Sequence, residues 1–278
     1  MLALPTPTLP PATSTNTALV GAARFVVVDP GTPHDEPLSQ LYAAIDQRRD
    51  DGAEWVGVAL THEHADHWGG LRALAVRYAD LGELPLWAHA RTHAHVRAEG
   101  VVPHDIDDGD DLDLDTIRLE VLHTPGHTRG HLSFLDRRQG VAYGGDVVAT
   151  EGTIIIDPPD GDMAAYLDTL ARLERLGLKT LVPSHGAPVP APSALLGWYI
   201  QHRLGREAQV MGALSDTFEG VETLVSRAYP EVAPMVYPLA ARSLLAHLIK
   251  LGDEGRAERA GGRWRRVDAL GGGPVHNP

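Results

Sequence analysis

The sequence predicts an α/β protein in which helices cover a sheet, followed by a small helical part at the C-terminus. Strand-like apolar runs alternate with helical patterns as far as Pro192, which is typical of layered α/β folds. Beyond Pro192 only helical patterns follow, before a Gly- and Arg-rich tail. The 278 residues, 43% of them hydrophobic, suffice for one large core and a smaller one. We therefore expect a domain boundary near residue 215.

The individual elements follow from the period of the apolar residues. Strands are expected at about residues 55–60, 84–88, 117–122, 131–135, 141–145 and 180–183. Helices are expected near residues 39–49, 69–80, 90–98, 162–176, 192–213, 217–228 and 237–251. In the helix at 162–176, leucines at positions 167, 170, 173 and 176 form one stripe, so this helix should lie against a sheet.

Composition divides the chain into four segments. Residues 1–16 are rich in Pro and Thr and lack the basic start and apolar core of a signal peptide, so we expect a flexible lead. Residues 17–214 should form the main domain, 215–270 the helical domain and 271–278 a flexible tail. No run of about 18 apolar residues occurs, so no membrane span is expected. We expect a cytoplasmic protein, and the absence of cysteine is compatible with a reducing compartment.

The strongest functional signal is a cluster of imidazoles and carboxylates directly after the strand at 55–60. The segment 61–67 reads THEHADH and holds three histidines. Imidazole nitrogen and carboxylate oxygen are the ligands that hold zinc and its first-row neighbours. His62 and His64 are two residues apart and can face the same side, whereas Asp66 and His67 lie beyond the turn. The segment therefore predicts a metal site.

Three later strand ends supply further residues of the same kind. The strand at 117–122 leads into a tight Pro-Gly turn that presents His127. The strand at 141–145 ends in two glycines, which allow the backbone to come close to whatever Asp146 holds. His185 follows the strand at 180–183. Together these strand ends predict a site for two metal ions.

The ordered series HxHxDH, a later His, an Asp and a final His resembles the metallo-β-lactamase superfamily, which implies an αββα sandwich. The resemblance implies that one metal is bound by His62, His64 and His127, the other by Asp66, His67 and His185, and that Asp146 bridges the two. The absence of cysteine excludes the branch that has a Cys ligand. We expect two divalent ions, with zinc first and manganese or iron as alternatives.

Later segments resemble more specifically the β-lactamase-like protein 2 family, whose members add a small winged-helix-like domain at the C-terminus. These segments are Gly161–Met163 with Tyr166–Leu167, His202–Arg203 with Arg206–Glu207, and Leu244–Leu248 with Lys250–Leu251 and Glu254–Gly255. The likeness spans residues 15–267, and Ser184 stands where the family usually has Gly.

A metal-bridging hydroxide is the expected nucleophile, because two ions about 3.5–4 Å apart lower the pKa of a shared water. Asp66 is the expected catalytic carboxylate that orients it. Metal-bound histidines usually donate their second ring nitrogen to an outer group, for which we consider Glu63, His123 and His131. The alternative of a metal-binding module without catalysis would be marked by a lost ligand, and none of the seven is missing.

Two substrate classes fit this chemistry, and we favour the first. It is a small thioester, ester or lactone; the other is single-stranded RNA, which the resemblance to the β-lactamase-like protein 2 family implies. Residues 1–200 carry 14 Lys and Arg against 28 Asp and Glu, a charge that repels polyanions.

Two groups of residues are candidates for phosphate contacts. The pair His202 and Arg203 is the expected substrate-binding pair, and the other group comprises Arg256, Arg259, Arg263, Arg265 and Arg266. The alternative for this basic group is a solvated hairpin whose Trp264 packs against the helix at 244–248. No motif indicates an oligomeric state.

Overall fold

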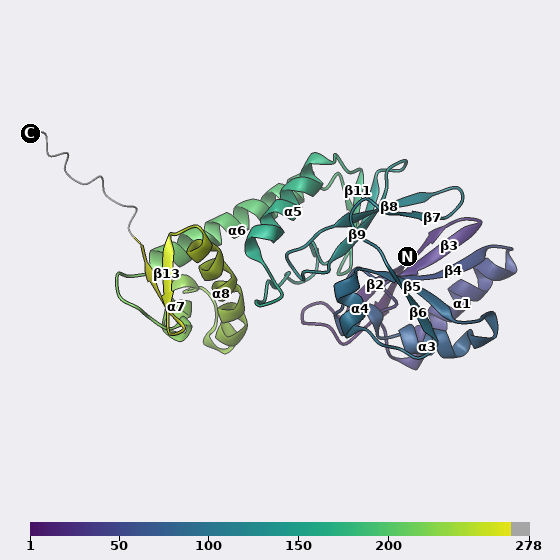
Figure 1. The fold of residues 1–278 in the computed structure, drawn as a ribbon, viewed down its shortest axis with the longest axis horizontal. Helices are drawn as coiled ribbons and strands as arrows, with labels where there is room; N and C mark the ends of the chain where they lie inside the picture. The colour runs from purple at the N-terminus through teal and green to yellow at the C-terminus, as the bar shows by residue number, and fades with distance from the viewer. Residues whose placement is uncertain (268–278) are drawn as a thin grey trace, which may run out of the picture.

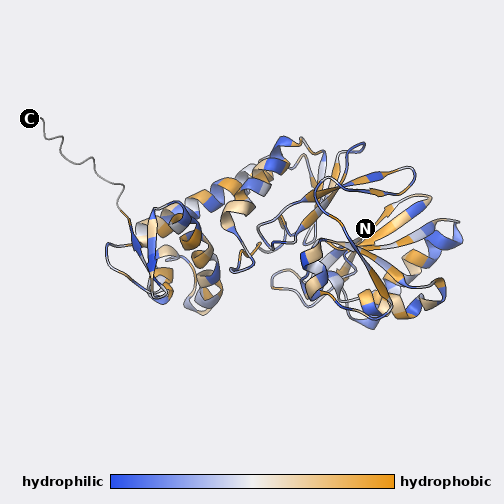
Figure 2. Cartoon of the chain, viewed as in Figure 1, coloured by the Kyte–Doolittle hydropathy of each residue, from blue (hydrophilic) through white to orange (hydrophobic). Residues whose placement is uncertain are grey.

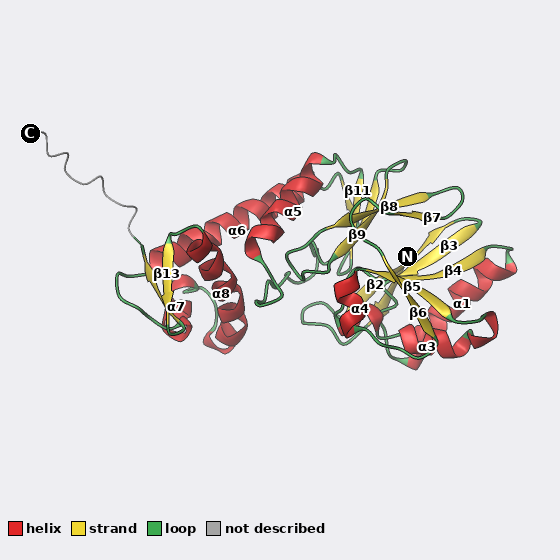
Figure 3. Ribbon diagram, in the orientation of Figure 1, coloured by secondary structure: helices red, strands yellow, loops and turns green. Residues whose placement is uncertain are grey.

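A computed structural model describes residues 1–267 as two lobes that one long helix, α6 (Ser193–Ala213), joins (Figure 1). The larger lobe holds two sheets face to face with helices on the outer sides, and the smaller lobe is mainly helical (Figure 3). This is the predicted layered α/β architecture with a helical part at the C-terminus.

The first sheet has the strand order β1-β2-β3-β4-β5-β6, with parallel pairing from β3 to β6. Its strands are β1 (Leu2–Pro5), β2 (Ser14–Gly21), β3 (Arg24–Val28), β4 (Glu54–Ala59), β5 (Leu84–Ala88) and β6 (Val101–Asp105). The helices of this half are α1 (Asp35–Asp50), α2 (Ala65–Trp68), α3 (Leu71–Arg77), η1 (Ala79–Leu81) and α4 (Ala90–His95).

The second sheet has the order β12-β11-β10-β9-β8-β7. Its strands are β7 (Asp111–Asp113), β8 (Arg118–His123), β9 (Leu132–Asp136), β10 (Val141–Gly145), β11 (Thr180–Pro183) and β12 (Val189–Pro190). Helix α5 (Met163–Arg175) covers its outer face with Leu170 and Leu173, as its leucine stripe predicts.

The alternation of side chains along β3 builds two cores at once. Phe25 and Val27 pack with α1 and α3 on the outer face of the first sheet, whereas Val26 and Val28 pack between the two sheets. On the opposite sheet, Phe134 of β9 belongs to the same inner layer. Figure 2 shows these strands as mostly hydrophobic, with hydrophilic residues on the outer faces of the helices (Figure 2). Apolar burial on both faces thus holds the four layers together.

The structure differs from the expected flexible lead at residues 1–16. Residues of β1 pair with β2 in an antiparallel ladder, and Leu4 is fully buried in the core of the first sheet. The Pro and Thr content of this segment indicated a loop. Strands β1 and β2 can form with few apolar residues, because they pair at the edge of a larger sheet and tertiary contacts override their weak local preference.

The smaller lobe consists of α7 (Val221–Ala228), η2 (Pro234–Val236), α8 (Tyr237–Asp253) and the hairpin β13 (Ala257–Ala260) and β14 (Arg263–Arg266). Trp264 is 3% exposed and shares a core with Leu244 and Leu248, as the hairpin alternative predicted. The predicted tail at 271–278 lies outside the described residues. No helix within residues 1–267 is long and apolar enough to cross a membrane.

Candidate metal centre

The strand directions explain why distant residues meet at one edge of the sandwich. β9 is antiparallel to both β8 and β10, and β10 is parallel to β11, so β8, β10 and β11 end at the same edge. The turns that follow them carry His127, Asp146 and His185. The turn after β4 joins this edge through the backbone N–H of Leu132, which donates to the Thr61 carbonyl at 2.8 Å.

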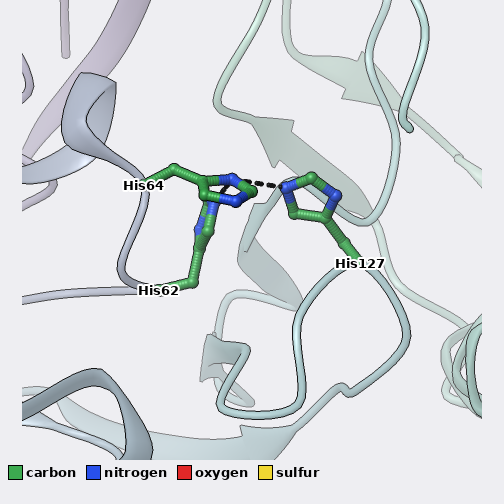
Figure 4. A group of neighbouring side chains, drawn as sticks. All are labelled: His62, His64 and His127. Carbon is green, nitrogen blue, oxygen red and sulfur yellow. Dashed lines mark hydrogen bonds between the residues drawn. The ribbon is translucent and has the colours of Figure 1, made fainter. Parts of the chain in front are cut away.

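Three imidazoles converge at the first half of the site (Figure 4). His64 Nδ1 lies 3.0 Å from His62 Nε2 and 2.9 Å from His127 Nε2. His62 is fully buried, whereas His64 lines the cavity above the site. The two residues of the HxH pair therefore do face the same point, as the spacing predicted.

Asp66, His67 and His185 form the second half, and their ligand-type atoms lie within 4.8 Å of one another. Asp146 lies between the halves. Its carboxylate oxygens are 3.7 Å from His67 Nε2, 3.4 Å from His127 Nε2 and 3.5 Å from His185 Nε2. All seven predicted residues are thus brought together.

The donor set fits divalent cations. His67 Nε2 and Asp146 Oδ1 are buried, and neither has a hydrogen-bond partner among the described residues. Buried polar atoms without partners are costly unless something else satisfies them. Most rings are also fixed by their other nitrogen: His62 by Thr61 Oγ1 at 3.0 Å, His67 by Asp29 Oδ2 at 2.9 Å, His127 by the Ile155 carbonyl at 2.8 Å and His185 by the Ser14 carbonyl at 2.9 Å. This is the usual arrangement behind metal-bound histidines.

Burial and neighbouring charges separate the pKa values of the site. Burial lowers the pKa of His62 well below its usual value and that of His64 to about 4, and nearby imidazoles add to both shifts. Burial alone would lower the pKa of His67, but the carboxylates of Asp146 and Asp29 outweigh it and raise that pKa to about 9. The pKa of Asp146 is lowered: burial opposes this shift, and the histidines around the carboxylate overcome it. At neutral pH His62 and His64 are therefore in the neutral form that binds metals.

The metal-free protein is expected to lose stability as the pH rises from 6.5 to 9. The folded-state pKa of His67 is raised from 6.5 to about 9, so the stability that its proton contributes is fully present below pH 6.5 and is lost as the pH rises to about 9. The loss in the free energy of unfolding should be on the order of 3 kcal/mol. Urea unfolding of chelator-treated protein at the two pH values measures it. Equal stability at both pH values, or an undiminished difference in His67→Asn, would contradict this account.

Asp29 is the important residue that the sequence analysis missed. It is 1% exposed, and its carboxylate accepts hydrogen bonds from Thr61 N at 2.8 Å, Thr61 Oγ1 at 2.7 Å and His67 Nδ1. Asp29 follows the apolar run 25–28 directly, so it is one more carboxylate at a strand end. That signal was present in the sequence.

The three candidates for groups behind the metal ligands lie in different positions. His131 is fully buried, and its Nε2 accepts the backbone N–H of Asp146 at 2.9 Å. Gly145 makes this possible, since its φ is +59° and a Cβ there would lie 2.5 Å from His131 Nε2. Glu63 accepts from Thr128 Oγ1 at 3.2 Å, beside His127. His123 instead faces the Arg129 carbonyl at 2.9 Å and stacks on a ring outside the site.

The structure places the expected substrate-binding pair elsewhere. Arg203 is 5% exposed, its Nη2 donates to the Ile154 carbonyl at 2.5 Å, and its guanidinium lies over the Tyr166 ring. His202 stacks on Trp198. Neither residue lines the cavity at the site. Arg203 therefore has a structural role. It binds the Ile154 carbonyl and so fixes this segment, in which the next carbonyl, that of Ile155, orients the His127 ring.

Most of the predicted basic group is engaged in ion pairs. Arg256 pairs with Glu207 and Glu254, Arg265 with Glu258, and Arg266 with Asp216. Arg259 lies over the Trp264 ring. None of the five lines the cavity at the site, and the hairpin that carries four of them packs through Trp264, as the alternative proposed.

A cavity of about 520 Å³ opens over the centre. His64, Asp66, His127, Asp146 and His185 form its floor. The walls come from the connection between β1 and β2, the segment between β10 and α5, and helix α8: Pro7, Thr8, Leu9, Pro10, Ala12, Ala149, Glu151, Gly152, Thr153, Ile155, Asp157, Pro159, Asp160, Leu239 and Arg242. The segment expected to be a flexible lead therefore contributes to the cavity.

Comparisons with known proteins agree with this geometry. The model of the metallo-beta-lactamase superfamily matches residues 10–185, and that of the beta-lactamase associated winged helix domain matches residues 221–264. A Caenorhabditis elegans protein named beta-lactamase-like protein 2 homolog is 26% identical over 238 residues, which are 85% of this chain and 77% of the relative. An atrochrysone carboxyl ACP thioesterase of Aspergillus chevalieri is 26% identical over 204 residues, 73% of this chain and 61% of the relative.

Among solved structures, a metallo-beta-lactamase family protein from Thermus thermophilus has the same fold. Its TM-score is 0.76 at 22% identity, and the match covers 96% of this chain and 98% of the other. The family match, the αββα sandwich with its winged-helix domain and the cluster of His and Asp side chains agree. The chain belongs to the metallo-β-lactamase superfamily and is a metal-dependent hydrolase.

Proposed function

We propose that this chain hydrolyses a small acyl substrate, a thioester foremost, with an ester or lactone as the alternatives. One divalent ion would be held by His62, His64 and His127, the other by Asp66, His67 and His185, with Asp146 between them. When bound, such ions lower the pKa of water and polarise a carbonyl oxygen. Zinc suits these ligands best, and manganese or iron are the alternatives.

The shape and lining of the cavity carry this proposal. Its volume of about 520 Å³ is in the range of small-molecule sites, roughly 300–1,000 Å³. Apolar side chains such as Leu9, Ile155 and Leu239 line its walls and suit an acyl chain, while Glu151 and Asp160 would repel a polyanion. The relative named as an acyl carrier protein thioesterase supports the same substrate class.

Asp66 is proposed as the catalytic carboxylate. It lines the cavity floor, with Oδ1 3.8 Å from His67 Nε2 and Oδ2 3.6 Å from His185 Nε2. From this position a carboxylate oxygen accepts a hydrogen bond from the attacking water and orients its lone pair toward the substrate carbonyl.

Turnover of a thioester, ester and lactone panel, compared with cleavage of unstructured RNA at several salt concentrations, tests the proposal. We expect thioester hydrolysis to be the fastest reaction and nearly independent of salt, and we expect His127→Ala to abolish it. RNA cleavage that outpaces every acyl substrate and falls steeply with salt would contradict the proposal.

A further inference from the structure

The winged-helix domain contributes a wall to the active-site cavity. Leu239 and Arg242 of α8 line it together with His64 and Asp66 of the other lobe. In Figure 1, α8 lies on the side of the smaller lobe that faces the sandwich. The C-terminal domain is therefore placed to contact whatever occupies the cavity. The metal-ligand residues lie in the other lobe, so metal binding alone does not require this contact.

Arg242 is the one Lys or Arg among the described residues that line this cavity. Its guanidinium Nη2 lies 2.9 Å from Asp157 Oδ2, and the two side chains are 58% and 36% exposed. An ion pair this exposed contributes little to stability, because water competes for both partners. The guanidinium can therefore exchange one carboxylate for another at little cost.

Arg203 does not share this freedom. Arg203 lies on the neighbouring helix α6, but it is buried and its guanidinium is committed to the Ile154 carbonyl and the Tyr166 ring. Arg242 has one carboxylate partner on the cavity wall and a side chain more than half exposed. Of the two, only Arg242 can meet a ligand in the cavity.

We propose that Arg242 binds an oxyanion on the substrate and that Asp157 competes with that oxyanion for the guanidinium. This rests on the proposed acyl hydrolase function and narrows it to thioesters that carry a carboxylate or a phosphate. The planar guanidinium fork matches both groups through paired hydrogen bonds. The apolar walls receive the uncharged part of the substrate, while Arg242 fixes its charged end.

Three matched thioesters test the proposal and distinguish the two sources of the oxyanion. Butyryl-pantetheine is neutral, succinyl-pantetheine places a carboxylate on the acyl side, and butyryl-4′-phosphopantetheine places a phosphate on the thiol side. KM and kcat are measured for the wild type, Arg242→Gln, Asp157→Asn and the double variant. Arg263→Gln is the matched control, since it removes an exposed arginine of the same domain outside the cavity.

We expect the wild type to prefer one charged thioester over the neutral one, and Arg242→Gln to reduce that preference about tenfold, mainly through KM. Asp157→Asn should increase the preference for the charged thioester. This increase should be much smaller when Arg242 is already Gln, because the two side chains act as a pair. The charged thioester that responds identifies the oxyanion as carboxylate or phosphate. Equal effects of Arg242→Gln on charged and neutral substrates, or no effect, would overturn the proposal.

Binding of the corresponding thioethers, which cannot be hydrolysed, separates this inference from the proposed function. Titration calorimetry with the metal-loaded variants should show the same dependence on Arg242 and Asp157. If no thioester is turned over but the charged thioether still binds through Arg242, the acyl hydrolase proposal fails and the oxyanion site stands. If the charged and neutral thioethers bind the wild type equally well, the oxyanion site is refuted.

Discussion

Replacement of Asp146 by asparagine is expected to reduce kcat/KM by more than about 100-fold without unfolding the protein. The Asp146 carboxylate lies within 3.4–3.7 Å of His67, His127 and His185. An amide keeps the shape but removes the negative charge, and its NH₂ group cannot serve as a ligand. Steady-state kinetics and circular dichroism measure the two parts of this prediction.

The matched control for this variant is Asp168→Asn, which makes the same chemical change at an exposed position of α5. It should keep wild-type activity and metal content. If Asp146→Asn retained most of the turnover, the carboxylate would not be part of the reacting centre, and the arrangement of two halves around it would be wrong.

Replacement of Asp29 by alanine is expected to affect stability and metal affinity together. It leaves Thr61 N, Thr61 Oγ1 and His67 Nδ1 without their acceptor in a fully buried region. Unsatisfied buried donors should lower the free energy of unfolding by about 2–4 kcal/mol. Because His67 also loses the group that fixes its ring and tautomer, metal affinity should fall roughly 10–100-fold.

Chemical unfolding and metal titration in competition with a chelator measure the two effects. Asp29→Asn separates them, since the amide oxygen still accepts a hydrogen bond while the charge beside His67 is gone. Asp80→Ala, at an exposed site in η1, is the control for the loss of a carboxylate. Unchanged metal affinity in Asp29→Ala would show that the buried carboxylate serves folding alone.

Most of the site could be predicted because its residues follow apolar strands in the sequence. A strand end is visible as an apolar run followed by Gly, Pro or a polar residue, and His62, His127 and His185 all lie there. The parallel directions of β8, β10 and β11 then bring such ends to one edge. Asp29 has the same signal, but it lies far from the THEHADH segment in sequence, and its pairing with Thr61 exists only in the folded chain.

Other features depend on tertiary contacts that no local pattern encodes. Leu4 is buried because β1 pairs with β2 at the edge of the first sheet, although the Pro-rich segment after it has the composition of a loop. Arg203 was expected to contact phosphate groups of the substrate. Its burial under the segment at 154 could not be read from the helix alone. The contribution of α8 to the cavity likewise requires the two lobes to be placed together.

Elemental analysis of purified, metal-supplemented and desalted protein tests most directly whether the seven side chains between His62 and His185 hold two divalent ions. We expect about two ions per chain, and a value well below two for Asp146→Asn. A wild-type protein that retains no metal after supplementation would contradict the account.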